Sequence, residues 1–337
     1  MDFCYIDIEK EFSRSDPSFT AISKKNFSFV LLNNFSMIAF ASAIEPLRLA
    51  NRMANANLFS WTLLATDGYE SKCSNGTVVK CDGNLDASTT KIGTTLICGG
   101  TEIRQNTSKK LISWIRKEAR KGTTLGGLCT ATYVLATAGL LENKKCTIHW
   151  ENRDSFSEEF PEHKLSSSIY TIDKKIVTAA GGTAAADLIL HLIGQHYGVD
   201  LANAIADQMI YTSIRNENDT QRLSIPTRIG VRHPRLASAL ELMEKSLEEP
   251  VSPSSLADKV GLSTRQLERL FRRYLNRSPK RYYMELRLQK ARNLLVQTDM
   301  TVINVALACG FSSPSHFSKC YRNYFSTTPY REKGSRE

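Results

Sequence analysis

The stretch LADKVGLS at residues 256–263 is followed 49 residues later by VALACGFS at residues 305–312. Both stretches have Ala at their second position, Gly at their sixth and Ser at their last. With one extra residue in the second copy, the similarity continues through Leu267/Phe317, Phe271/Tyr321, Arg272/Arg322, Tyr274/Tyr324 and Ser278-Pro279/Thr328-Pro329. The last third of the chain therefore contains an internal repeat of two helical segments around a short turn.

Each copy has the residues that a tight helix–turn–helix needs. A small Ala (Ala257, Ala306) permits close helix approach, and a Gly (Gly261, Gly310) suits a left-handed turn. Ser263 in the first copy, and Ser312 or Ser313 in the second, can cap the following helix.

The helix after Ser263 is two-sided. Helical spacing places Leu267, Leu270 and Phe271 inward and the polar residues Arg265, Glu268, Arg269 and Arg272 outward. Two packing αα-hairpins are the structural alternative, but the matched turn, cap and basic face in both copies favour two DNA-reading helix-turn-helix units.

Between the copies, residues 281–296 have the pattern of one continuous helix, about 24 Å long. Such a spacer would set two recognition helices about one DNA turn, ~34 Å, apart. We expect a DNA-binding domain at 233–337, with helix-turn-helix units near 254–275 and 302–325 and a connecting helix near 281–297.

Positive charge is concentrated in the same region. The net charge is +10, yet residues 226–337 hold 20 of the 44 Lys and Arg and only 10 of the 34 Asp and Glu, which leaves 24 of each in residues 1–225. A basic domain beside a neutral one indicates a module that binds a polyanion, attached to a module with another task.

Residues 256–331 resemble the DNA-binding domain of AraC/XylS-family regulators. The most specific segments are RLQKARNLL (287–295), ALACGF (306–311) and SHFSK (315–319), whereas Phe325-Ser326-Thr327 lacks the Gly common in the family. The resemblance implies base contacts by Arg265, Glu268 and Arg269 in the first recognition helix and by Ser315, Ser318 and Lys319 in the second. It implies phosphate contacts by Arg272, Arg273, Arg322 and Lys280.

The region before residue 212 alternates strand and helix patterns. Expected strands are 27–32, 61–65, 94–98, 123–128 and a hairpin of 169–171 with 175–178. Expected helices are 37–53, 107–121, 130–141, 183–197 and 201–211, and Pro46 is expected to kink the first of them or end it early. This order predicts an α/β domain at 26–212 with a mostly parallel sheet flanked by helices, before an all-α domain. Residues 1–25 are expected to be a flexible leader and 213–232 a linker.

Cys129 lies between an expected strand and an expected helix, which is the place of a nucleophile at a strand-to-helix turn. Residues 27–210 resemble the PfpI-like, class I glutamine-amidotransferase-like fold in CGG (98–100), LCT (128–130), TIHW (147–150) and TAAGGT (178–183). Active relatives usually have Gly two residues after the Cys and often His directly after it, where this chain has Ala131 and Thr130.

Catalysis is therefore not expected. The stretch MIAF (37–40) lacks the Glu that peptidase-like relatives direct at the Cys, so Cys129 and His149 form an incomplete, vestigial pair. The remaining alternatives are a small-molecule pocket retained from the enzyme fold, a redox-sensing thiol, and a purely structural or dimerising domain. The first is favoured.

In open α/β sheets, ligands bind at the carboxyl ends of the strands. This rule nominates the loops at 33–36, 99–102, 129–130 and 149–151, with the candidate ligand-binding residues Phe35, Ser36, Gly99, Gly100, Thr101, Cys129, Thr130, His149 and Trp150. Phe35 and Trp150 could face a cation, with Glu102 or Glu151 as countercharge; the alternative is that the rings belong to the core.

The pairing of the two domains is similar to the GlxA-type regulators. The segments FSMIAFA (35–41), EPLR (45–48), GVRHP (230–234) and LSTRQLERLF (262–271) resemble the subgroup that controls catabolism of quaternary amines, such as betaine and carnitine, or of arginine. This implies a transcription activator that binds operator DNA, a small nitrogenous effector and RNA polymerase. A homodimer is compatible with it; a cysteine-dependent amidase or deglycase, or a redox sensor, fused to a DNA-binding domain is the alternative.

The sequence predicts no cofactor and no metal site. The eight cysteines form no C-x-x-C pair, and no His cluster has zinc spacing. We find no apolar run near the ~20 residues that span a bilayer and no signal-peptide core, so we expect a cytoplasmic protein without a membrane partner.

Overall fold

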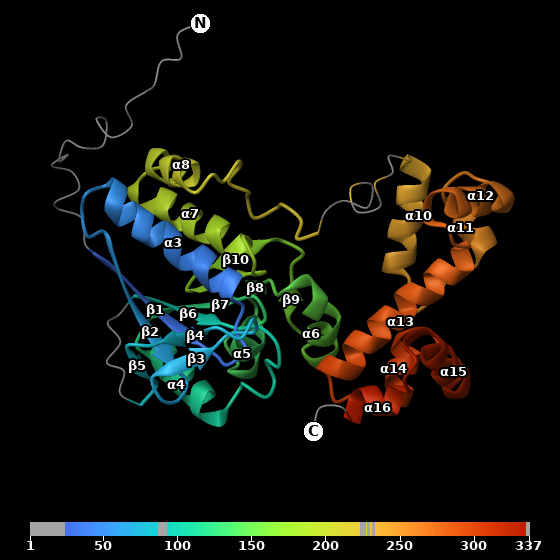
Figure 1. Cartoon of the computed structure of the whole chain (residues 1–337), viewed down its shortest axis with the longest axis horizontal. Helices are drawn as coiled ribbons and strands as arrows, with labels where there is room; N and C mark the ends of the chain where they lie inside the picture. The colour runs from blue at the N-terminus through green and yellow to red at the C-terminus, as the bar shows by residue number, and fades with distance from the viewer. Residues whose placement is uncertain (1–23, 87–92, 223–226, 228–229, 231–232, 335–337) are drawn as a thin grey trace, which may run out of the picture. The chain divides into compact units, whose positions relative to one another are not determined.

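The computed structural model describes residues 24–86, 93–222, 227, 230 and 233–334. The chain divides between Gln221 and Arg222 into two compact units, called here the first unit and the second unit (Figure 1). The expected leader 1–25 lies almost wholly outside the described residues, as does part of the segment 230–234.

The first unit is built on a seven-stranded sheet, and the α/β prediction is confirmed. Its strand order is β10-β11-β7-β6-β1-β2-β5, and only the pair β10–β11 is antiparallel. The strands are β1 (Lys25–Leu31), β2 (Phe59–Ala65), β5 (Gly83–Asn84), β6 (Thr94–Cys98), β7 (Thr124–Leu128), β10 (Tyr170–Asp173) and β11 (Ile176–Ala179).

The central parallel strands end level with one another. Leu31 pairs with Cys98, Cys98 with Leu128, and Leu128 with Ala179. These four residues define what we call the carboxyl edge of the sheet. The loops that follow them are thereby brought to one place, as the sequence predicted.

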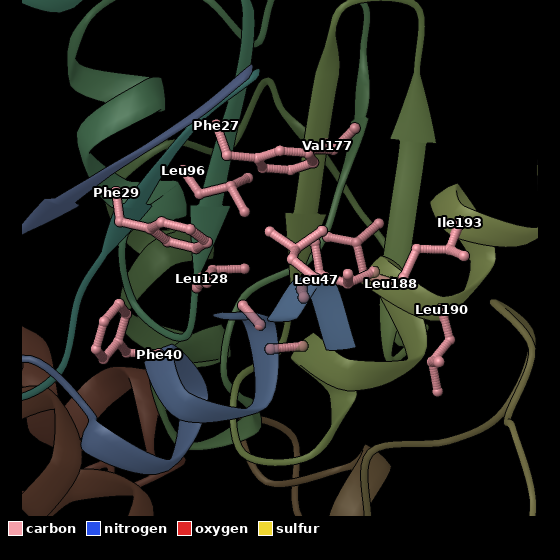
Figure 2. Packing of buried hydrophobic residues seen from close by; sticks show 14 of the residues in the cluster. Phe27, Phe29, Phe40, Leu47, Leu96, Leu128, Val177, Leu188, Leu190 and Ile193 are labelled. Atoms are coloured by element: carbon pink, nitrogen blue, oxygen red, sulfur yellow. The ribbon is translucent and has the colours of Figure 1, made fainter. Parts of the chain in front are cut away.

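Alternating side chains bury both faces of the sheet. Phe29, Leu96 and Leu128 face α3, α7 and α8, where Leu47 and Leu188 complete the core cluster (Figure 2). Val30 and Ile97 face the opposite layer of α4, α5 and α6. The helices are α3 (Met37–Met53), α4 (Lys109–Arg120), α5 (Thr132–Thr137), α6 (Arg153–Glu159), α7 (Ala184–Tyr197) and α8 (Val199–Gln208). A parallel sheet covered on both faces requires such apolar strands.

Several elements differ from the sequence prediction. Helix α3 continues through Pro46 to Met53, because its buried residues, among them Ala43, Pro46 and Leu47, pack into the core and offset the cost of the missing hydrogen bond. Helix α5 is shorter than 130–141 and is followed by Gly139 at φ +72°. Sequence reasoning missed the pair β3 (Glu70–Lys72) and β4 (Val78–Lys80), the pair β8 (Lys145–Cys146) and β9 (Lys164–Leu165), the 3-10 helix Trp150–Asn152, and α6.

The predicted linker 213–232 begins too early. Residues 213–221 belong to the first unit, and Arg215 bonds to Asp187 there at 2.6 Å. The segment has few large apolar residues, which is why the sequence indicated a linker. Hydrogen bonds and an ion pair hold it to the first unit instead.

The second unit is helical, as expected. Its helices are α10 (Pro234–Lys245), α11 (Pro253–Lys259), α12 (Thr264–Leu275), α13 (Pro279–Gln297), α14 (Val302–Ala308), α15 (Pro314–Phe325) and α16 (Pro329–Gly334). Helix α13 contributes Tyr283 to a cluster with Leu267 and Phe271, and Leu295 to a cluster with Phe317 and Tyr321. It thus joins two small cores, one for each helix-turn-helix unit. None of the described helices in either unit is long and apolar enough to cross a membrane.

Candidate nucleic-acid interface and ligand edge

The two turns have the geometry that the repeat predicted. Gly261 and Gly310 adopt φ of +66° and +71°, the left-handed region that a Cβ would strain. Ala257 and Ala306 are fully buried, one in each core. At Gly310 a Cβ would also come within 2.6 Å of the Glu248 carbonyl oxygen, so this turn has no room for a side chain.

Both recognition helices are capped at their first turn. Ser263 accepts a hydrogen bond from the Gln266 backbone N–H at 3.2 Å, and the Gln266 side chain accepts one from Ser263 N–H at 2.8 Å, forming a capping box. In the second copy Ser313, and not Ser312, caps α15 by accepting from His316 N–H. The caps fix where each recognition helix starts.

Helix α12 presents a basic face to solvent. Leu267 and Phe271 are fully buried, whereas Arg265, Glu268, Arg269 and Arg272 are exposed. Within residues 233–334, no ion pair neutralises Arg265, Arg269 or Arg272. These guanidinium groups are free to bind base edges or phosphates.

Arginines outside the recognition helices are used within the fold. Arg277 and Arg281 bond to Glu285 at 2.7 and 3.2 Å, and Arg292 bonds to Glu332 at 2.9 Å. These three guanidinium groups are therefore engaged by carboxylates within the fold, unlike those of Arg265, Arg269 and Arg272.

Helix α15 has fewer charged groups on its solvent side. Ser315, Lys319 and Arg322 are exposed and Ser318 is partly exposed, while Phe317 and Tyr321 are fully buried. The two helices thus place Arg265 and Ser315, and Arg269 and Lys319, at equivalent positions, with the stronger polar set on α12.

Arg287 fastens the second turn to α13, a role that sequence reasoning missed. Its guanidinium donates hydrogen bonds to the carbonyl oxygens of Cys309 (2.7 Å) and Gly310 (2.6 Å) and lies 4.0 Å from the centre of the Phe311 ring. These contacts satisfy carbonyls at the end of α14 and hold the turn that orients α15.

Ser326 directly follows α15, within the stretch Phe325-Ser326-Thr327, and adopts a left-handed φ of +58°. Replacing Ser326 with Gly should raise the free energy of unfolding of the second unit by about 1 kcal/mol, because Gly has no Cβ to strain this conformation. Chemical denaturation measures the change. Asn276→Gly, at φ +53° after α12, is the matched control and should gain less, since Asn tolerates this region. A loss of stability in Ser326→Gly contradicts the expectation.

In the first unit, Cys129 lies at the carboxyl edge in a strained turn. It follows β7 directly, has φ +62°, and is 8% exposed. A Cβ on Gly181 would come within 2.8 Å of the Cys129 Cβ, so this glycine permits the close approach of the loop after β11. The nucleophile-elbow geometry predicted from sequence is present.

Hydrogen bonds join the loops of the carboxyl edge. The Gly99 carbonyl accepts from Ser36 N–H at 2.9 Å, the Gly100 carbonyl accepts from the Thr130 hydroxyl at 2.7 Å, and the Cys129 carbonyl accepts from His149 N–H at 3.2 Å. The candidate ligand residues from four loops are therefore neighbours. Thr101 and Trp150 are the most exposed of them, and Trp150 is 41% exposed.

Two of the candidate residues do not face a ligand. Phe35 is fully buried and packs edge-on against Phe40, so the prediction that its ring contacts a cation is wrong. The Ser36 hydroxyl accepts from Ala39 N–H as the cap of α3. Glu102 accepts a hydrogen bond from the Asn34 amide at 2.6 Å.

The electrostatics of Cys129 and His149 oppose nucleophilic catalysis. Burial, together with the nearby Glu151 carboxylate, raises the pKa of the Cys129 thiol to about 11, although a hydrogen bond from the Thr130 backbone N–H opposes the shift. Burial lowers the pKa of His149, while Glu151 opposes that shift. Both groups are neutral at pH 7, and among the described residues no hydrogen bond joins their side chains.

We expect iodoacetamide at neutral pH to modify Cys129 about a hundredfold more slowly than an unperturbed thiol, because a pKa of about 11 instead of 9.0 leaves about a hundredth of the thiolate. The rate should rise about tenfold per pH unit up to that pKa. Peptide mass spectrometry measures it, with the partly exposed Cys320 as internal reference. Rapid labelling of Cys129 at pH 7 contradicts this account.

Sequence reasoning also missed Arg215 and Gln221, which it assigned to the linker. Arg215 pairs with Asp187, which is fully buried, and the Gln221 amide donates to the Ile148 carbonyl at 3.0 Å. No local signal identifies them, because both lie in a polar stretch without helical or strand periodicity.

Comparisons with known proteins agree with both units. Residues 30–195 match the DJ-1/PfpI family, and residues 256–333 match a helix-turn-helix domain family. A solved AraC-family transcriptional regulator from Pseudomonas putida is similar over 55% of this chain and 99% of its own, with a TM-score of 0.50 and 28% identity.

Several relatives match this chain across both of its units. The HTH-type transcriptional regulator CdhR of Pseudomonas aeruginosa is 43% identical over 92% of this chain and 91% of its own length. The HTH-type transcriptional regulator GbdR of the same species is 42% identical over 92% of this chain and 84% of its own length. The HTH-type transcriptional regulator GlxA of Rhizobium meliloti is 35% identical over 90% of this chain and 94% of its own length. The chain therefore belongs to the GlxA-type AraC-family transcriptional regulators, which bind DNA and combine a DJ-1/PfpI domain with a helix-turn-helix domain.

Proposed function

We propose that the first unit binds a small nitrogenous cation at its carboxyl edge and that this ligand controls DNA binding by the second unit. The observation that carries the proposal is that the partly exposed Trp150 ring lies against the His149 ring, and that the next residue, Glu151, places a carboxylate near enough to act on Cys129 and His149. An aromatic face and a carboxylate are what a quaternary ammonium group or a guanidinium requires.

The sequence resemblance to regulators of quaternary-amine or arginine catabolism supports the same ligand class. We propose glycine betaine, carnitine, choline and arginine as the compounds to test, with the protein acting as an activator of a catabolic operon. RNA polymerase, and a second copy of the chain, are the proposed protein partners.

The first unit is proposed to sense rather than catalyse. Its relatives are named as transcriptional regulators, and the raised pKa of Cys129 supports an inert thiol. If Cys129→Ser keeps ligand response and transcription intact, both an enzyme and a thiol redox sensor are excluded.

A thermal-shift screen tests the ligand proposal. A bound amine at about a hundredfold excess over its Kd stabilises the protein by ~2.7 kcal/mol, which raises Tm by several degrees. Glu151→Gln should abolish that shift, because it removes the countercharge, whereas Glu142→Gln, an exposed acid outside the carboxyl edge, should keep it. The proposal is wrong if none of the four compounds raises Tm, or if Glu151→Gln responds like the wild type.

A further inference from the structure

Residues 211–221, called here the exit segment, lead from α8 to the start of the second unit and are fixed at both ends. At the first end, the Tyr211 hydroxyl and the Arg215 guanidinium both donate to Asp187 Oδ2, at 3.0 and 2.6 Å. At the far end, Ile169 N–H donates to the Asp219 carbonyl at 3.2 Å, and Ser168 forms an antiparallel bridge with Thr220.

Gln221, the last residue of the first unit, completes the far end. Its Nε2 lies 2.9 Å from Thr147 Oγ1, 3.0 Å from the Ile148 carbonyl oxygen and 3.0 Å from the Ser168 carbonyl oxygen. The Thr147 hydroxyl already donates to the Ser168 carbonyl at 2.7 Å, so all three partners are acceptors. Their chemistry requires the NH₂ group of the amide at this place and excludes its oxygen.

Thr147 and Ile148, which accept hydrogen bonds from Gln221, are followed directly by the proposed ligand-binding residues His149 and Trp150. Ile148 precedes His149 and Trp150, and His149 N–H donates to the Cys129 carbonyl. Thr147 N–H donates to the Thr178 hydroxyl of β11 at 2.8 Å. The loop 147–150 therefore has the carboxyl edge on one side and the end of the exit segment on the other.

We propose that Gln221 is a clamp that couples the ligand loop to the DNA-binding unit. With the clamp closed, the chain is held to the first unit up to Gln221; when a ligand at Trp150 and Glu151 displaces the Ile148 carbonyl, the clamp opens and residues 216–221 join the tether of the second unit. This inference rests on the proposed function for its trigger, but not for the clamp itself.

The contacts suit a reversible device. Buried Gln221 Oε1 has no hydrogen-bond partner among the described residues, so the closed state carries an unsatisfied acceptor that opening relieves. In the part of the chain that the structure describes, the first end of the exit segment has no such unsatisfied group, because the fully buried Asp187 accepts hydrogen bonds from Arg215 and Tyr211 there. The far end is accordingly the end that opens.

The test uses the full chain without ligand. Gln221→Ala should increase hydrogen exchange in peptides covering 216–222 and tighten binding, by about fivefold or more, to a duplex enriched by the wild-type chain from random DNA. Gln221→Glu, which is isosteric but presents a carboxylate oxygen to three acceptors, should do the same. Gln208→Ala, at an exposed position in α8, is the matched control and should change neither quantity.

A second arm adds glycine betaine, carnitine, choline or arginine, whichever raises Tm. Wild-type DNA affinity should rise toward that of Gln221→Ala, and the variant should no longer respond, although its own thermal shift with the ligand persists. Unchanged exchange and unchanged DNA affinity in both Gln221 variants overturn the clamp. If no amine affects the wild type, the proposed function fails, while the ligand-free comparison still decides the clamp.

Discussion

Arg269→Ala should weaken binding to the preferred DNA by about 1–3 kcal/mol and relax selectivity at one base position. Arg269 is exposed on α12, about one and a half turns from the capped start of the helix, and no ion pair within residues 233–334 competes for it. A guanidinium in a major groove can donate two hydrogen bonds to one guanine, and alanine removes both. Fluorescence anisotropy with single-base variants of the site measures the effect.

Arg272→Ala on the same helix is the matched comparison. As the expected phosphate contact, it should weaken binding to all sequences alike and reduce the slope of log K against log salt by about 1. If Arg269→Ala also lowers affinity uniformly, Arg269 is a phosphate contact and the assignment of base reading to this position is wrong.

Arg215→Ala should lower the free energy of unfolding of the first unit by about 2–4 kcal/mol, the largest stability effect that we expect. Asp187 is fully buried in α7, and Arg215 donates to it from the backbone N–H (2.8 Å), Nε (3.0 Å) and Nη2 (2.6 Å). Removal of the guanidinium leaves a buried carboxylate without its countercharge. We place the cost toward the lower end because the Arg215 side chain is 35% exposed.

A double-mutant cycle separates charge from packing. In an Asp187→Asn background the residue at 187 is uncharged, so Arg215→Ala should cost much less than it does in the wild type. Chemical denaturation monitored by circular dichroism provides the four free energies. Equal costs in the two backgrounds would mean that the ion pair does not stabilise the exit segment.

The second unit could be predicted well because its repeat is local. Gly261 and Gly310 mark turns, Ser263 and Ser313 cap helices, and the apolar spacing of Leu267 and Phe271 defines the buried face. Each of these features depends on residues a few positions apart, which a sequence displays directly. The boundaries of α12 and α15 follow from them.

The carboxyl edge could be predicted only in part. The strand-to-helix turn at Cys129 was evident from sequence, but the direction of the Phe35 ring was not, since Phe35 is held by bridges to Cys73 and Gly100, which lie 38 and 65 residues away. Arg215 and Gln221 were missed because their partners, Asp187 and Ile148, lie 28 and 73 residues away. Polar contacts of this kind have no periodicity.

The most direct test of the account is the enrichment of binding sites from a random DNA pool by the full chain. If α12 and α15 read successive major grooves, the selected sites should contain two clusters of preferred base pairs. The centres of the clusters should lie about one helical turn of DNA, 10–10.5 base pairs, apart. The cluster read by α12 should tolerate fewer base changes, and Arg269→Ala should lose selection in that cluster alone. Enrichment of no sequence, or of a single cluster that Arg269→Ala leaves intact, would contradict the account.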